Sequence, residues 1–278
     1  MPNIRELTFD QLSETIAGLG EKSFRAKQIY DWLWNKSARS FDQMNNVPLV
    51  LRNKLAETFA FTPIVVAHEQ RSSDRTIKYG FKLHDDYLIE GVLIPTASRM
   101  TACVSSQVGC SLSCKFCATG KLDRVRNLNA DEIYDQVAII REQSMEVYNI
   151  PLSNIVYMGM GEPLLNYANV ISSIERITSA NGLGMSPQRI TVSTAGIAKM
   201  INKLGDDEVK FNLALSLHAA NDSKRDKIMP INEHNNLDVL RDALKYFYDK
   251  TGTRVTYEFI VFNNFNDSLK DAQELAEF

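Results

Sequence analysis

Apolar residues recur at helical spacing in the N-terminal part of the chain. Three segments carry such residues three or four positions apart: 9–19, 23–35 and 47–59. This period places the apolar side chains on one face of a helix, so we expect three short helices that pack together. Ser23 and Ser40 are the expected N-caps. The pattern predicts a small helical domain over residues 1–61.

The pattern then changes to short runs rich in β-branched and aromatic residues. These runs are 64–67, 76–83, 87–94 and 100–106, and they predict strands. Asp85 and Asp86 stand between the second and third runs, as is typical of a tight turn. We therefore expect antiparallel strands in a β-rich connector over residues 62–98.

Strand and helix patterns alternate through the rest of the chain. Strands are expected at 154–158, 189–193, 210–217 and 254–261, and helices at 129–144, 167–180, near 197, at 237–248 and from 268 onward. Asn129 and Glu132 have the spacing of a capping box at the first of these helices. Counting the strand at 100–106, five strands belong to β/α units, too few to close an eight-stranded barrel. The prediction is an α/β fold with a partial, open parallel β/α barrel over residues 99–278.

The last predicted helix runs to the end of the chain. Leu269, Ala272 and Leu275 keep helical spacing up to Phe278, with no cap and no strand that follows. Because helix ends leave unsatisfied carbonyls and a crossover helix needs a strand to lead to, we expect a truncated chain that lacks the final strand and a C-terminal tail.

Composition is that of an ordinary globular protein, with 44% hydrophobic and 23% charged residues among 278. No apolar run approaches the ~20 residues of a membrane helix, and the N-terminus does not resemble a signal peptide, so we expect a cytoplasmic protein with no membrane partner. The net charge of −3 argues against a protein that coats nucleic acid. Basic stretches at 21–54 and 115–126 are either local contacts for phosphate or solvated faces.

All four cysteines fall between positions 103 and 117. Cys110, Cys114 and Cys117 form a C-x3-C-x2-C run after the first barrel strand. Three thiolates can ligate three irons of a [4Fe-4S] cluster and leave the fourth iron open. A structural zinc would need a fourth ligand, either Cys103 or a distant histidine, and free or disulfide-linked thiols are a third interpretation.

Small or polar residues follow three further strands. Gly161 and Glu162 lie in a Gly-Met-Gly-Glu-Pro segment, Ser193 ends the next strand, and Ser216 with His218 ends the one after it. Taken singly, such a serine is a satisfied strand end and such a histidine is a packed residue. Because the carboxyl ends of barrel strands meet on one rim, their convergence favours a shared ligand site.

The cysteine run, with Phe116 in its aromatic position, resembles the signature of the radical S-adenosylmethionine (SAM) superfamily. Over most of its length the chain is similar to the RlmN family of dual-specificity RNA methyltransferases, to which the resistance methyltransferase Cfr is related. The segments that carry the resemblance are 24–33, 89–95, 103–110, 159–163, 190–196, 216–219 and 229–232.

The resemblance implies methylation of carbon 2 of adenine, in the peptidyl transferase centre of 23S rRNA and in the anticodon loop of tRNA. It implies a [4Fe-4S] cluster and SAM as cofactors, a flavodoxin-type electron donor, a disulfide bond and a monomeric enzyme. Glu90 would be the catalytic base and Cys103 the cysteine that resolves the covalent adduct. The residues that would hold SAM are Gly161, Glu162, Ser193, Ser216, Leu217 and His218.

Without the resemblance, Glu90 would be a solvated strand residue and Cys103 a buried strand thiol. No cysteine follows Cys117, so the family's methyl-carrying cysteine has no counterpart here. We therefore expect the chain to bind the cluster and SAM without methylating RNA. The helical domain resembles an RNA-docking domain. Its basic side chains, Lys22, Arg25 and Lys27, lie near two tryptophans in the sequence. These tryptophans, Trp32 and Trp34, either stack on RNA bases or belong to the core.

Other functions remain compatible with these residues. A Cfr-like enzyme would methylate carbon 8 of adenine, and a related radical enzyme would act on a peptide. A catalytically inactive RNA-binding fragment would bind RNA without cleaving SAM. A zinc-stabilised interaction module would contain zinc in place of iron and sulfide.

Overall fold

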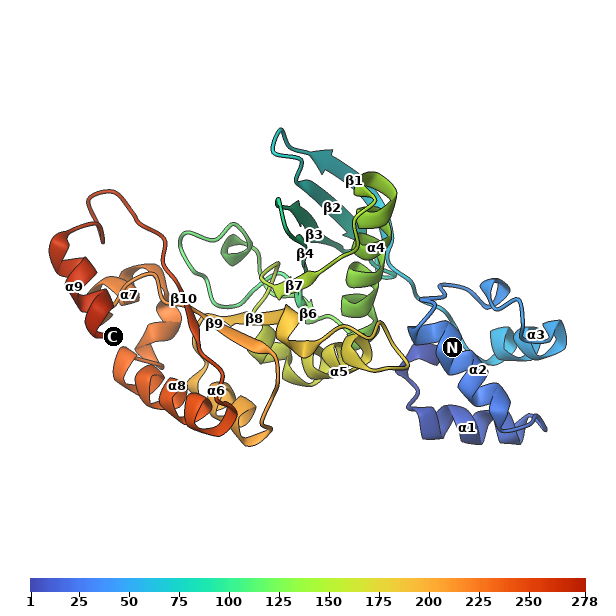
Figure 1. The fold of residues 1–278 in the computed structure, drawn as a ribbon. Coiled ribbons are helices and arrows are strands. Elements are labelled where there is room, and N and C mark those ends of the chain that lie inside the picture. The colour runs from blue at the N-terminus through green and yellow to red at the C-terminus, as the bar shows by residue number, and fades with distance from the viewer.

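In the computed structural model, which describes residues 1–278, a central sheet separates the N-terminal helices from the C-terminal ones (Figure 1). The helices are α1 (Phe9–Gly18), α2 (Phe24–Trp34), α3 (Leu49–Thr58), α4 (Ala130–Tyr148), α5 (Tyr167–Thr178), α6 (Ala198–Asp206), α7 (Asp222–Ile228), α8 (Leu237–Thr251) and α9 (Leu269–Glu277). The strands are β1 (Val65–Arg71), β2 (Ile77–Lys82), β3 (Leu88–Pro95), β4 (Met100–Cys103), β5 (Gln107–Val108), β6 (Arg126–Asn127), β7 (Asn154–Tyr157), β8 (Ile190–Thr194), β9 (Asn212–Ser216) and β10 (Thr256–Glu258).

The main sheet has eight strands in the order β1-β2-β3-β4-β7-β8-β9-β10. The pairs from β4 through β7, β8 and β9 to β10 are parallel, and those from β1 to β4 are antiparallel. This confirms the open, partial parallel barrel with five β/α strands. The antiparallel strands, expected as a connector, continue the same sheet.

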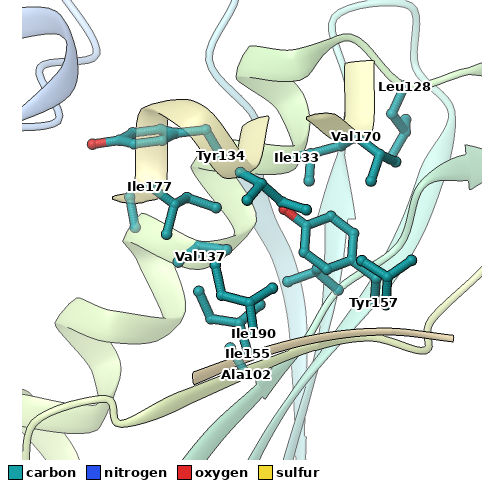
Figure 2. Packing of buried hydrophobic residues seen from close by; sticks show 14 of the residues in the cluster. Ala102, Leu128, Ile133, Tyr134, Val137, Ile155, Tyr157, Val170, Ile177 and Ile190 are labelled. Atoms are coloured by element: carbon teal, nitrogen blue, oxygen red, sulfur yellow. The ribbon is translucent and has the colours of Figure 1, made fainter. Parts of the chain in front are cut away.

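Helices α4 and α5 cover the sheet with a continuous apolar layer (Figure 2). Ile133 and Val137 of α4 pack toward Ile155 and Ile190 of two neighbouring strands, and all four are fully buried. The predicted capping box of α4 is confirmed, since the side chain of Asn129 and that of Glu132 are both engaged. Propensity, cap and packing therefore agree at this helix, which lies against β3 and β4.

The three N-terminal helices form where the apolar spacing predicted them, and Ser23 and Ser40 stand at N-cap positions as expected, but neither side chain caps its helix. Ser23 has helical dihedrals and makes no capping hydrogen bond, and Ser40 makes none either. The capping box instead joins Thr8 and Gln11 at the start of α1. One cluster of 53 buried apolar residues includes side chains from these helices and from the barrel. The division at residues 61 and 98 stays a prediction.

Several elements differ from the predicted pattern: β1 runs on to Arg71, β4 ends at Cys103, and the short strands β5 and β6 were not expected. Helix α7 forms in a segment without apolar periodicity, and β10 ends three residues earlier than expected. No helix combines the length and the apolar composition needed to cross a membrane.

A buried ion pair joins the N-terminal segment to the barrel. The Arg5 Nη1 atom lies 2.7 Å from Asp135 Oδ1 on α4, and neither side chain is more than 1% exposed. The guanidinium also lies 4.9 Å from the ring centre of Trp34, a core residue of α2. Because a buried charge without its partner is strongly unfavourable, this pair fixes how α4 meets the N-terminal helices.

Replacing Asp135 by Ala should lower the free energy of unfolding by about 3–5 kcal/mol, because Arg5 would keep its charge in the core without a partner. Urea unfolding followed by circular dichroism measures the change. The matched control is Asp238→Ala, which breaks an exposed pair with Arg241 and should cost less than about 1 kcal/mol. Equal effects of the two substitutions would contradict this account.

Candidate active site

A cavity of about 210 Å³ opens at the carboxyl ends of the parallel strands, beneath the cysteine loop. Its wall includes seven of the predicted site residues: Cys110, Cys114, Cys117, Gly161, Glu162, Ser193 and Ser216. The structure thus brings together side chains from the loop after β4 and from the ends of β7, β8 and β9. This is the rim at which α/β barrels place their ligands.

The loop that contains the three cysteines, residues 110–117, is bound to the segments that follow β9. The N–H of Lys115 donates to the carbonyl of Ile228, at the end of α7, over 2.9 Å. The ring of Phe116 packs edge to face on the ring of His218, with centres 4.5 Å apart. The signature aromatic residue therefore anchors the loop to the end of β9.

The thiols fit a cluster better than a single ion. No three Cys, His, Asp or Glu side chains converge closely enough to hold one metal ion, as tetrahedral zinc requires. Ligands of a [4Fe-4S] cluster bind three separate irons and need not converge. All four cysteines are free thiols, so the implied disulfide bond is not formed. Burial raises the pKa of Cys114 to about 12, and only bound metal would hold such a thiol deprotonated.

The glycines after β7 serve protein packing. A Cβ on Gly159 would lie 2.7 Å from the Ser105 hydroxyl, and one on Gly161 would lie 2.5 Å from Gln107. Gly161 also has a φ of +97°, which disfavours other residues. Side chains of the neighbouring loop therefore occupy the space on the Cα side of these glycines, and the assignment of Gly161 to SAM binding stays a prediction. Gly161 still lines the cavity.

Glu162 is a buried carboxylate that joins two strand ends. It is 3% exposed, and its oxygens accept the N–H groups of Ala195, at 2.8 Å, and Leu164, at 3.0 Å. Burial raises the pKa of this carboxyl group, and these hydrogen bonds oppose the rise. Each oxygen keeps further acceptor capacity toward the cavity, which suits an ammonium group.

Glu258, the last residue of β10, is a member of the site that sequence reasoning missed. Its Oε2 atom accepts hydrogen bonds from the hydroxyl groups of Ser193, at 2.8 Å, and Ser216, at 3.2 Å. Since both hydroxyl hydrogens point to Glu258, both serine oxygens are free to accept. In this arrangement they suit ribose hydroxyl or ammonium donors.

Leu217 and His218 lie behind the cavity wall. The Leu217 side chain is fully buried, and its N–H donates to the carbonyl of Glu258. The His218 Nδ1 atom accepts the N–H of Ile260 at 3.2 Å, so its Nε2 atom carries the proton. Burial lowers the pKa of His218 to about 4, and the ring is neutral at neutral pH.

Glu90 and Cys103 do not line this cavity. Val92 pairs directly with Cys103, and Glu90 is two residues along from Val92, so both candidate catalytic side chains lie on one face of the sheet. Glu90 forms an ion pair with Lys78 at 3.0 Å and lines a second cavity of about 280 Å³. Burial raises the pKa of Cys103 to about 11.

The two cavities adjoin across the segment after β7. Gly159 and Gly161 line the first, and Met160 lines the second. The 118–122 segment that follows the cysteines likewise contributes Gly120 to the first and Ala118, Thr119 and Leu122 to the second. The cysteine-lined site therefore has a neighbouring compartment that contains Glu90.

Two protein-family models match different parts of the chain. Residues 2–61 match the "Ribosomal RNA large subunit methyltransferase N-terminal domain" family, and residues 104–278 match the "Radical SAM superfamily". Proteins described as "Probable dual-specificity RNA methyltransferase RlmN" align over 99% of the chain. The one from Cytophaga hutchinsonii is 59% identical, with 75% of its own length covered, and the one from Christiangramia forsetii is 57% identical, with 78% covered.

The chain belongs to the RlmN family. A crystal structure of a radical SAM methyltransferase from Sphaerobacter thermophilus superposes on the whole chain with a TM-score of 0.93 at 37% identity, and the chain covers 81% of it. The cofactors of an RlmN-type radical SAM protein are a [4Fe-4S] cluster and SAM, as the cysteine run predicted.

Replacing Cys114 by Ala should reduce iron and sulfide from about four of each per chain to below one after anaerobic reconstitution, because two thiolates hold a cluster poorly. Iron and sulfide assays with the visible absorption spectrum measure this. Cys103→Ala is the thiol control and should load fully. Iron loss in the control would show that Cys103 is a ligand, contrary to the C-x3-C-x2-C assignment.

Proposed function

We propose that this chain holds the cluster, SAM and adenine sites of a radical SAM enzyme that methylates carbon 2 of adenine in 23S rRNA and in tRNA; the methyl-carrying cysteine that the resemblance implies has no counterpart among its residues. The observation that carries the proposal is the cavity wall that joins three cysteines of one loop to the polar ends of β7, β8 and β9. The match of the whole chain to RlmN proteins supports the RNA substrate. Carbon 2 of adenine is not nucleophilic, so its methylation calls for cofactor-based radical chemistry.

Cys110, Cys114 and Cys117 hold the cluster through their thiolates, and the cavity beside them takes SAM. When bound, the cluster supplies the electron that splits SAM into methionine and a 5′-deoxyadenosyl radical. A flavodoxin-type protein in the cytosol is the electron donor.

The strand ends orient SAM against the cysteine loop. Glu162 accepts from the ammonium group of SAM, and its two backbone hydrogen bonds keep its carboxylate in place. Ser193 and Ser216 accept from ribose hydroxyl groups while Glu258 fixes the direction of both serine hydroxyls. His218 acts from behind the wall, where its neutral ring supports Phe116 of the cysteine loop.

The second cavity receives the target adenine. It is lined by the Glu90 carboxylate, by the His68 ring and by apolar side chains such as Leu88 and Met160, a mixture that suits a flat heterocycle. Glu90 removes the ring proton from carbon 2, and its ion pair with Lys78 holds the carboxylate at the cavity before the base arrives. Cys103, on the same face of the sheet, is the thiol to which the resemblance assigns resolution of the adduct, by forming a disulfide with a methyl-carrying cysteine that has no counterpart among these residues.

The N-terminal helices hold the RNA by backbone charge and aromatic stacking. Trp34 is 1% exposed and packs in the core, so it is not a stacking platform. Phe24 is 52% exposed, and the guanidinium of Arg25 lies 4.6 Å from its ring centre. Lys22 and Lys27 are exposed on the same helical segment, so Phe24 replaces Trp34 as the stacking residue.

The enzyme acts as a monomer.

Two measurements test the proposal. Anaerobically reconstituted and reduced protein should convert SAM to 5′-deoxyadenosine and methionine. Expression of the complete gene in cells without adenine methylation of 23S rRNA should yield 2-methyladenosine in mass spectra of digested 23S rRNA and tRNA. A product of 8-methyladenosine would assign Cfr-like chemistry, and RNA binding without SAM cleavage would overturn the enzymatic assignment.

Replacing Glu90 by Gln should separate the two halves of the reaction. Methylation should fall at least about 100-fold, since a base of this kind contributes that much or more. Cleavage of SAM, which uses the other cavity, should stay within about twofold of wild type. Glu69→Gln on β1 removes a carboxylate that pairs with Arg71 outside both cavities and is the control. Undiminished methylation in the Glu90 variant would exclude Glu90 as the base.

A further inference from the structure

Arg225 of α7 is fully buried beneath the rim, and it binds only neutral oxygens. Its Nε atom donates to the carbonyl of Leu217 at 3.1 Å, and its Nη2 atom donates to the carbonyls of Ala195 at 2.6 Å and Ser216 at 3.2 Å. Its Nη1 atom donates to the side-chain oxygen of Asn232 at 2.6 Å. One guanidinium therefore joins the segments that follow β8 and β9.

The neighbouring acids reach this cation only through the Asn232 side chain. Asp222 and Asp226 accept hydrogen bonds from the Asn232 side-chain nitrogen, at 2.8 and 2.6 Å, and neither binds the guanidinium. Burial lowers the pKa of Arg225 to about 10, so the group remains charged at neutral pH. A buried charge that lacks a counter-charge costs several kcal/mol, and native proteins rarely keep one without compensation.

The cysteine loop packs close to Arg225 and is a second source of compensating charge once it holds a cluster. Cys114 packs with Ala195, whose carbonyl accepts a hydrogen bond from Arg225, and with Met229, whose N–H donates to the backbone carbonyl of Arg225. The loop is hydrogen-bonded to the end of α7 through Lys115 and Ile228.

We propose that Arg225 is a positioning residue with two tasks: its charge is the buried counter-charge of the thiolate-held cluster, and its planar fork fixes the SAM-binding ends of β8 and β9. The proposal rests on the radical SAM function proposed above. A cluster held by three thiolates is an anion, so a fixed cation beside it stabilises the reduced form and raises the reduction potential. The fork geometry needs arginine, because lysine offers a point charge with one donor centre.

Two substitutions separate the tasks. Arg225→Lys keeps the charge and loses the fork, and Arg225→Met loses both. Lys227→Met removes an exposed positive charge from the same helix and is the matched control. Redox titration followed by electron paramagnetic resonance gives the cluster potential, and the spectral change on adding SAM gives its dissociation constant. Thermal unfolding of apo and cluster-loaded protein gives the stabilisation that the cluster confers.

We expect the methionine variant to have a lower reduction potential than wild type, and a smaller rise in unfolding temperature on loading the cluster, because the buried cation no longer gains a partner. Both Arg225 variants should bind SAM about tenfold more weakly, since carbonyls at the strand ends lose their donors. The lysine variant should keep a potential close to wild type. Lys227→Met should match wild type in every measurement.

Equal behaviour of the two Arg225 variants in the redox titration would contradict the proposal that Arg225 is the counter-charge of the cluster. This holds if both variants keep the wild-type reduction potential and also if both fail to load the cluster. Wild-type SAM affinity in both variants would overturn the positioning of the strand ends. None of these measurements uses RNA, so the identity of the methylated base does not affect them. Wild-type protein that binds neither cluster nor SAM would overturn the proposed function itself.

Discussion

The parallel pairing of β4, β7, β8, β9 and β10 is the constraint on which the site depends. Parallel strands end at the same edge of a sheet, so the residues after each strand meet although they lie far apart in sequence. Two buried charged groups then join neighbouring strand ends: the Glu162 carboxylate binds the N–H of Ala195, and Arg225 binds the carbonyls of Ala195 and Ser216. Both backbone groups of Ala195 are therefore hydrogen-bonded, the N–H to Glu162 and the carbonyl to Arg225, and these bonds fix the rim before any cofactor binds.

Much of this fold follows from local sequence. The helices and strands of the barrel have strong periodicity and, at α4, a capping box that specifies the first residue. Helix α7 was not predicted because its segment, Asp222–Ile228, is almost entirely polar, and the buried residue that holds it in place is Arg225. A helix whose core-facing residue is charged carries no hydrophobic signal, since its burial depends on backbone acceptors supplied by distant strands.

The candidate site likewise combines residues that a local sequence pattern predicts with residues that only the folded structure reveals. The cysteine run and the polar strand ends are local patterns, and the structure places seven of the predicted residues around one cavity. Glu258 was missed for a specific reason: apolar residues continue past it, so the pattern extends the last strand to residue 261, whereas β10 ends at Glu258. The glycines after β7 line the cavity, and their absent Cβ atoms also make room for Ser105 and Gln107, a close contact between protein segments that no local sequence pattern reveals.

The two buried arginines illustrate how such charges are compensated. Arg5 has its partner in the same chain, because Asp135 completes the pair whenever the protein is folded. Arg225 binds neutral partners directly and meets Asp222 and Asp226 only through Asn232, so we propose that the cluster completes its compensation. Folding of the rim and loading of the cluster should then be thermodynamically linked, since any group that binds only the native state stabilises it. The same cation that weakens the apo rim strengthens the loaded one, which makes cluster binding part of the stability of the SAM site as well as of its chemistry.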